Sequence, residues 1–151
     1  MQLREMPALR ALENYPERLE LRCLFADMDS FRHINNGSIG RYFEEARATV
    51  NAMIFGKDSL INPDAVQLLF ANSETDFIAQ VRYPGSVQIG TGVLKIGSSS
   101  WTLVQGIFQD GACCALNRSV LVKARKDKST PLDAGERATM ERFLLIGIEA
   151  I

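Results

Sequence analysis

The residues best suited to chemistry stand together in the stretch DMDSFRHINNGSIGRYFEEAR, residues 27–47. It holds two aspartates, of which Asp29 is the second, then the single histidine, His33, and the pair Asn35 and Asn36. A carboxylate can attack an electrophilic carbon or activate water, and a histidine transfers protons near neutral pH. The stretch therefore predicts nucleophilic or acid–base chemistry, provided that the fold brings these groups together.

A long amphipathic helix is predicted over residues 36–55, directly after these polar groups. Its apolar residues recur at spacings of three and four, which places them on one stripe: Ile39, Tyr42, Phe43, Ala46, Val50, Met53 and Ile54. Asn35 or Asn36 can cap the start of the helix, and Gly56 can end it. Because the first N–H groups of a helix lack internal partners and carry partial positive charge, this helix start is a candidate anion site.

The remaining apolar patterns predict β-strands. They cover residues 18–26, 66–78, 87–96, 101–109 and 112–123. Asp110 and Gly111 are typical of a tight hairpin turn, and Gly90 and Gly92 suggest a bulge or bend. Asp133 and Glu136 form a possible capping pair for a short helix, and the apolar tail FLLIGIEAI is expected to pack on the protein.

Length and composition favour one ordinary globular domain over residues 1–151. Hydrophobic residues make up 46% and charged residues 23% of the chain, and the formal net charge is −1. This charge gives no case for nucleic acid as a partner. No run of about eighteen apolar residues indicates a membrane span, so a cytoplasmic protein is expected. The three cysteines have no metal-ligand spacing and are expected to be buried thiols.

One long helix with five strands predicts an α+β fold in which an antiparallel sheet wraps around the helix. Such a sheet leaves edges with unpaired backbone groups. Pairing of edges between two copies would satisfy them, so a homodimer, or a dimer of dimers, is expected.

The segment DMDSFRHINN followed by RYFEEAR resembles the signature of the hotdog-fold acyl thioesterases of the 4-hydroxybenzoyl-CoA type. The resemblance continues through VRYPGSVQIGTGVLKIGSSSW and ALNRSVLVKARKDKSTPL. It implies a hotdog fold and an acyl-CoA thioesterase that releases a carboxylate and free coenzyme A. No metal or organic cofactor is implied, since coenzyme A is part of the substrate.

The same resemblance assigns roles in the opening stretch. Asp29 would be the catalytic carboxylate, acting as nucleophile or as general base, and the backbone N–H of Asn36 would hold the oxyanion. Asp27 would be a structural acid that bonds loop N–H groups. His33 would be a hydrogen-bonding spacer or a proton-transfer group, and Phe31 stands where plant-type acyl-carrier-protein thioesterases carry Asn.

Substrate contacts are expected in an acyl pocket between the helix and the sheet, and in two segments later in the chain. The acyl pocket would be lined by Phe31, Tyr42 and Phe77. Ser99 and Ser100 lie in a segment near which the pantetheine arm commonly runs in the family, although turn formation alone would account for them. Lys123 and Arg125 belong to a basic cluster that marks either a solvated strand end or a contact to the phosphates of coenzyme A.

Departures from the family pattern keep other functions open. Arg32 replaces the usual Gly and would be strained if the loop required a positive φ. Ile39 stands where Tyr is usual, and Glu44 is a reserve catalytic acid on the helix. The alternatives are an acyl-carrier-protein thioesterase, an enoyl-CoA hydratase-like enzyme and a non-catalytic acyl-CoA-binding module.

Overall fold

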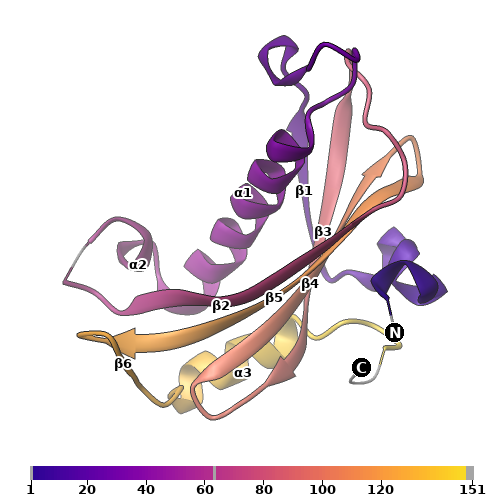
Figure 1. Cartoon of the computed structure of the whole chain (residues 1–151). Helices are drawn as coiled ribbons and strands as arrows, with labels where there is room; N and C mark the ends of the chain where they lie inside the picture. Colours follow the sequence, from indigo (N-terminus) through magenta and orange to yellow (C-terminus); the bar gives the residue numbers. More distant parts are fainter. Residues whose placement is uncertain (1, 63, 149–151) are drawn as a thin grey trace.

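The computed structural model describes residues 2–62 and 64–148 and shows a curved antiparallel sheet with one long helix along it (Figure 1). The strands are β1 (Glu17–Arg22), β2 (Gln67–Phe77), β3 (Ser86–Ile96), β4 (Ser100–Gln109), β5 (Ala112–Arg125) and β6 (Lys128–Ser129). The helices are α1 (Asn36–Phe55), α2 (Asp58–Ile61) and α3 (Ala134–Arg142), with short 3-10 turns at Leu3–Glu5, Pro7–Arg10, Leu12–Asn14 and Phe25–Asp27. The predicted α+β arrangement is confirmed.

The sheet has the strand order β1-β3-β4-β5-β2, and every neighbouring pair is antiparallel. The β4–β5 hairpin turns at Asp110 and Gly111, whose φ angles of 51° and 81° fit the predicted tight turn. β1 and β2 form the two long edges. β2 exposes Phe70 and Phe77, while the predicted homodimer stays a prediction.

The first strand is shorter than predicted. Residues 18–26 were expected to be extended, but β1 ends at Arg22 and Phe25–Asp27 forms a 3-10 turn. Cys23 lies beyond the end of β1 but is still buried in the core. The alternation of apolar and polar residues in the sequence therefore continues past the last residue of the strand. The chain then turns away from β3 toward the start of α1.

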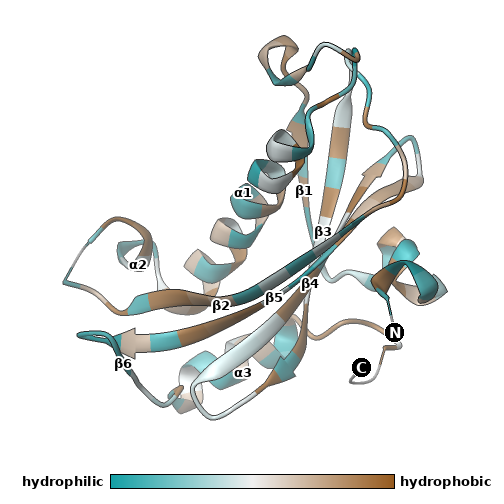
Figure 2. Cartoon of the chain, viewed as in Figure 1, coloured by the Kyte–Doolittle hydropathy of each residue, from teal (hydrophilic) through white to brown (hydrophobic). Residues whose placement is uncertain are grey.

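α1 has the predicted bounds. Asn35 caps it, since its side-chain oxygen accepts a hydrogen bond of 2.7 Å from the Gly37 N–H, and Gly56 ends it with a φ of 86°. Hydrophilic and hydrophobic residues alternate along the helix (Figure 2). The buried stripe departs from the prediction in one place, because Met53 is 47% exposed.

The bulge in β3 is displaced from its predicted place. The register shifts between Val93 and Lys95, whereas Gly90 and Gly92 pair regularly with β4. These glycines serve close packing instead. A Cβ on Gly90 would lie 2.5 Å from the Tyr15 ring, and one on Gly92 would lie 2.4 Å from a Leu145 methyl group. Both glycines therefore make room on the sheet face opposite α1.

The two ends of the chain cover that opposite face. Tyr15 is fully buried there, and its hydroxyl donates a 2.6 Å hydrogen bond to the Leu9 carbonyl. The Leu145 N–H donates to the Val93 carbonyl at 3.0 Å, so the apolar tail packs on its own sheet. Its last part, residues 149–151, lies outside the described residues.

The structure confirms the predicted buried thiols and the predicted short helix near the end of the chain. Cys23, Cys113 and Cys114 are buried and free, and burial raises the pKa of the Cys113 thiol to about 11. Asp133 and Glu136 form the predicted capping box at the start of α3. None of the described helices is long and apolar enough to cross a membrane.

Candidate active site at the start of the central helix

The polar stretch before α1 folds into a tight loop. Met28 and Ile34 form an antiparallel bridge, and inside it the Asp29 N–H donates to the His33 carbonyl at 3.0 Å. The Arg32 N–H donates to the Asp29 carbonyl at the same distance, and Arg32 has a φ of 64°. The expected strain at Arg32 is therefore present, because side chains other than glycine rarely adopt this conformation.

Asp27 ties this loop to the helix. One carboxylate oxygen accepts a 3.1 Å hydrogen bond from the Arg41 guanidinium, and the other accepts a 2.8 Å hydrogen bond from the Tyr42 hydroxyl. Its backbone carbonyl accepts from the Asn35 N–H at 2.8 Å. Burial, assisted by the bond to Asp27, raises the pKa of the Tyr42 hydroxyl. Asp27 is structural, but through side chains rather than the loop N–H groups that were expected.

Asp29 keeps a free carboxylate oxygen. Its Oδ1 accepts a 2.9 Å hydrogen bond from the Phe31 N–H, and its Oδ2 has no partner among the residues that the structure describes. The side chain is half-buried in the loop. It does not line the pocket at the helix start, so the structure does not bring Asp29 to the place where the sequence predicted it.

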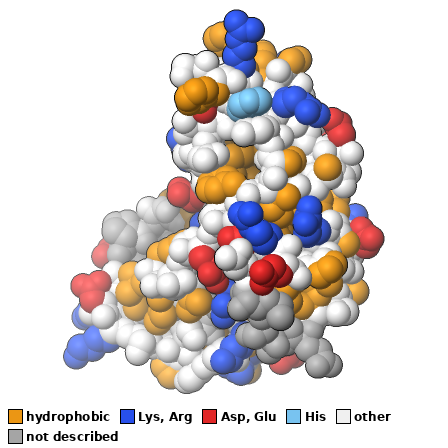
Figure 3. Space-filling model, turned by 45° about the vertical axis from the view of Figure 1, so that its right-hand side comes forward, with side chains coloured by type: hydrophobic (Ala, Val, Ile, Leu, Met, Phe, Trp, Pro, Cys, Tyr) orange, Lys and Arg blue, Asp and Glu red, His pale blue; other side chains and the backbone are white. Residues whose placement is uncertain are grey.

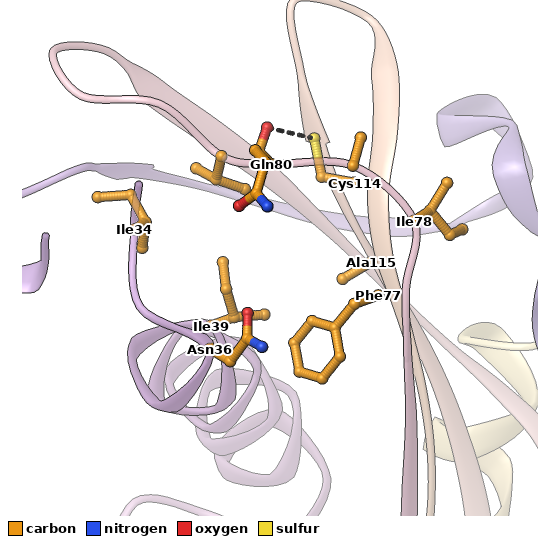
Figure 4. A pocket seen from close by; sticks show the side chains of 10 residues that line it. Ile34, Asn36, Ile39, Phe77, Ile78, Gln80, Cys114 and Ala115 are labelled. Atoms are coloured by element: carbon orange, nitrogen blue, oxygen red, sulfur yellow. Dashed lines mark hydrogen bonds between the residues drawn. The ribbon is translucent and has the colours of Figure 1, made fainter. Parts of the chain in front are cut away.

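A pocket of about 230 Å³ opens at the start of α1. It lies between the first turn of the helix, the segment after β2, and β5, and is lined by Ile34, Asn36, Ile39, Phe77, Ile78, Ala79, Gln80, Val81, Cys114 and Ala115. Figure 4 shows the Asn36 side chain and the Phe77 ring beside each other at one side of this space. Within the described part of the chain, the Asn36 N–H has no hydrogen-bond acceptor.

This pocket can accept an anionic or polarised oxygen on an otherwise apolar group. Asn36 is the first residue of the helix, so its N–H lies at the positive end of the helix dipole. Ile34, Ile39 and Phe77 supply apolar surface around it. The predicted oxyanion donor and one predicted acyl contact, Phe77, are thus brought together.

Three other predicted residues near the helix start lie outside the pocket. Phe31 is 78% exposed at the loop tip, and Tyr42 is buried in the core with its hydroxyl bound to Asp27. Neither is an acyl contact in this structure. His33 is half-buried, and its Nδ1 has no partner among the described residues. The histidine, in pale blue, is visible at the surface near the upper end of the molecule (Figure 3).

The predicted contacts to coenzyme A lie at the other end of α1. Ser99 lies in the bend before β4, and Ser100 is the first residue of that strand. The ring of the next residue, Trp101, lies 4.9 Å from that of Phe55, the last residue of the helix. The Ser99 carbonyl accepts a 2.8 Å hydrogen bond from the Lys123 N–H. The two serines do not reach the pocket.

Lys123 is also a structural residue. Its buried ammonium donates to the Glu136 carboxylate at 2.7 Å and to the Pro131 carbonyl at 3.2 Å. This charge is already engaged within the chain, so the structure does not present Lys123 to a phosphate, and the contact to coenzyme A stays a prediction. Arg125 is exposed at the end of β5, far along the strand from the pocket.

Sequence reasoning missed a polar group under the middle of the helix. Arg47 is 7% exposed and Asn51 is 4% exposed, and both lie on the buried side of α1. The signal was present, because Arg47 follows Phe43 by four residues and precedes Val50 by three, which places it on the apolar stripe. Gln105 of β4, fully buried, accepts from the Arg47 Nη1 at 3.4 Å and donates to the Phe43 carbonyl.

Comparison with known proteins identifies the group of proteins with this architecture. Residues 23–143 match the model of the Thioesterase-like superfamily. The PA5185 protein from Pseudomonas aeruginosa is similar over 90% of this chain and 96% of its own, with 25% identity and a TM-score of 0.79. None of the curated proteins matches the chain.

Two further solved structures are similar. A predicted thioesterase from Bacillus stearothermophilus shares 25% identity, covering 87% of this chain and 98% of its own, with a TM-score of 0.79. A thioesterase from Thermus thermophilus, solved with coenzyme A and zinc, shares 24% identity over 87% of this chain and 96% of its own, with a TM-score of 0.77.

Proposed function

The chain belongs to the Thioesterase-like superfamily and has its hotdog fold, and on that premise we propose that it is an acyl-CoA thioesterase acting at the start of α1. The observation that carries the proposal is Asn36, which lines a pocket and whose backbone N–H lacks an acceptor among the described residues. The similar protein from Thermus thermophilus was solved with coenzyme A, which supports coenzyme A as the thiol carrier.

In the proposed reaction, the thioester carbonyl oxygen accepts a hydrogen bond from the Asn36 N–H. Addition of water, or of a carboxylate, to the carbonyl carbon places negative charge on that oxygen, and the helix start stabilises it. The carbon–sulfur bond then breaks, and the thiolate leaves and takes up a proton. When water adds, the carboxylate acts as base and takes the proton of the water, which supplies the thiol proton. When the carboxylate itself adds, the mixed anhydride that forms is hydrolysed by a water molecule to the released acid and the free carboxylate. The acyl group rests against Ile39 and Phe77.

Asp29 is the proposed carboxylate for this step, as nucleophile or general base. Both oxygens of Asp27 are engaged by Arg41 and Tyr42, whereas Asp29 retains a free oxygen in the same loop. Asp29 does not line the pocket, so direct contact requires that the thioester extend from the helix start toward the Asp29 loop, or that this loop move toward the helix start.

The test of the oxyanion donor uses the position of Asn36 in the helix. Proline has no N–H but is well tolerated as the first residue of a helix, and Asn35, with a φ of −61° and a ψ of 143°, already has the conformation that precedes proline. Asn36→Pro should keep the fold and lower kcat by about 100- to 1000-fold in a thiol-release assay. Asn36→Ala, which retains the N–H, is the matched control. Equal activity of the two variants would refute the role of this donor.

A second function has one observation in its favour. The placement of Asp29 outside the pocket fits a non-catalytic module that binds acyl-CoA without hydrolysing it. Such a module would be stabilised by coenzyme A in a thermal-shift assay, and no acyl-CoA of a broad panel would release thiol. Release of thiol that depends on Asn36 would select the enzyme.

A further inference from the structure

A second pocket lies between the middle of α1 and the sheet. Its volume is about 270 Å³, and its walls include Glu44, Arg47 and Asn51 from α1 and Leu68, Phe70 and Leu121 from β2 and β5. It differs in character from the pocket at the helix start, because it combines a buried charge with an aromatic ring and aliphatic side chains.

Arg47 brings a positive charge into this pocket, and the one acid in the pocket walls, Glu44, is exposed and forms no ion pair with it. No described Asp or Glu carboxylate lies within 4.0 Å of its guanidinium. Its only hydrogen bond in the described part of the chain is the long one to Gln105, and its guanidinium lies 4.5 Å above the centre of the Phe70 ring. Burial lowers the pKa of Arg47, opposed by the nearby Glu44. A buried charge is costly unless it is paired, and an amide with a ring face compensates it only in part.

Asn51 adds a second unsatisfied group. Its residue is 4% exposed, and the side-chain carbonyl oxygen has no hydrogen-bond partner among the described residues. That oxygen is an acceptor and calls for a donor, whereas the guanidinium of Arg47 has donors to spare and calls for an acceptor. A ligand carboxylate therefore pairs with Arg47, and it can bind Asn51 only through the N–H donors of the amide. Donors of Arg47 suit the two oxygens of a carboxylate.

Both pockets are lined by residues of α1 and of β2. Phe77 lines the first pocket and Phe70 the second, and both belong to β2. Arg47 follows Asn36 by eleven residues, which corresponds to about 16 Å along the helix axis. A substrate held at the helix start therefore has a second polar contact available further along α1.

We propose that the pocket around Arg47 and Asn51 binds a carboxylate at the far end of the acyl group, so that the preferred substrates are thioesters of dicarboxylic acids. This inference rests on the proposed function. The carboxylate neutralises Arg47, and the chain that leads to it packs against Leu68, Phe70 and Leu121. A neutral acyl chain of the same length offers the apolar contacts but leaves Arg47 unbalanced.

The first experiment measures kcat/KM for pairs of acyl-CoAs of equal chain length, one ending in a carboxylate and one in a methyl group. The wild-type protein should prefer the carboxylated member, and Arg47→Gln should lower kcat/KM for it by about 10- to 100-fold, mainly through KM. Activity on the methyl-ended member should change little. Arg47→Lys, which keeps the charge, should recover part of the loss, and Arg142→Gln on the exposed end of α3 is the control.

Two results would overturn the assignment. One is a wild-type preference for methyl-ended chains, and the other is an equal loss on both substrates in Arg47→Gln. Because Arg47 also holds Gln105, circular dichroism and thermal melts must show that the variant folds. Asn51→Ala leaves those contacts in place and should produce the same selective loss on a smaller scale if Arg47→Gln does not fold.

The second experiment needs no hydrolysis and separates this inference from the proposed function. Octanoate should raise the melting temperature of the wild-type protein more than octanol does, and Arg47→Gln should abolish the difference. Binding of this kind without thiol release from any acyl-CoA would leave the carboxylate site standing while refuting the thioesterase. Thiol release without an effect of octanoate would support the thioesterase and refute the carboxylate site. If Arg47→Gln changes only the oligomeric state, its partner is a carboxylate of a second copy, and the proposal is wrong.

Discussion

The two ends of α1 are built from similar residue types but are used differently. At its start, Asn36 lines a pocket and Asp29 keeps a free oxygen. At its end, Phe55 packs on Trp101, and the nearby Lys123 is enclosed with Glu136. The charge of Lys123 at the closed end is satisfied within the chain, whereas the Asn36 N–H and one oxygen of Asp29 at the open end have no partner among the described residues. Unsatisfied polar groups beside a pocket, rather than charge as such, mark the end that can bind a ligand.

The largest effect is expected at the open end. Asp29→Asn should lower kcat by about 100- to 10,000-fold, because it removes the proposed base or nucleophile. Its amide oxygen can still accept from the Phe31 N–H, so the melting temperature should hardly change. Steady-state thiol release and a thermal melt measure the two quantities. Full turnover in this variant would remove Asp29 from the reaction.

The opposite pattern is expected at the closed end. Lys123→Met should lower the free energy of unfolding by about 3–5 kcal/mol, because it leaves the Glu136 carboxylate without its buried partner. Pairing it with Glu136→Leu should recover much of that loss. Urea unfolding gives the stabilities, and kcat/KM of the folded Lys123→Met protein should match the wild type. A selective rise in KM for coenzyme A thioesters would instead restore Lys123 as a substrate contact.

A smaller effect of opposite sign is expected in the loop of Asp29. Arg32→Gly should stabilise the protein by about 0.5–1 kcal/mol, since glycine adopts the positive φ without strain while losing some entropy on folding. Denaturant unfolding tests this change. Glu45→Gly on the exposed face of α1 is the control and should destabilise, because residue 45 is helical. Destabilisation by Arg32→Gly would show that the arginine side chain itself holds the loop.

The smallest effect concerns the thiol of Cys113, which packs with Tyr15 and Leu9 on the sheet face opposite α1. The folded-state pKa of about 11 lies above the ordinary value of 9.0. The folded protein therefore holds this proton more tightly than the unfolded chain, and the associated stability is present below pH 9 and lost as the pH rises through 11. Melting temperatures at pH 8 to 11 should fall more steeply for the wild type than for Cys113→Ala. Parallel curves would refute the shift.

Local patterns in the sequence carried much of this architecture. The stripe from Ile39 to Ile54 fixed the bounds of α1, and the Asp110–Gly111 pair located the hairpin, because both are governed by neighbours along the chain. The capping pair of α3 was predictable for the same reason. The resemblance of the opening stretch supplied Asn36 as the donor, and the structure gives that residue a pocket.

Tertiary contacts decided what the sequence could not. From the sequence, Lys123 is expected to be a solvated basic residue. In the structure, α3 places Glu136 beside it. Tyr42 is predicted to contact the acyl group, but in the structure its hydroxyl donates a hydrogen bond to Asp27. Arg47 stands on the apolar stripe of the helix, but arginine is seldom buried, and the sheet beneath α1 shows that it is enclosed. The partners of Lys123 and Tyr42 are remote in sequence and leave no local signal.

Gly90 and Gly92 have a consequence for shortening this protein. Each leaves a notch in the back of the sheet, one filled by Tyr15 and the other by Leu145. Residues near both ends of the chain thus pack against β3. Removal of the first sixteen residues, or of everything after Arg142, would expose the apolar surface of β3 that Tyr15 or Leu145 covers. A trimmed form would be expected to lose solubility before it lost its helix.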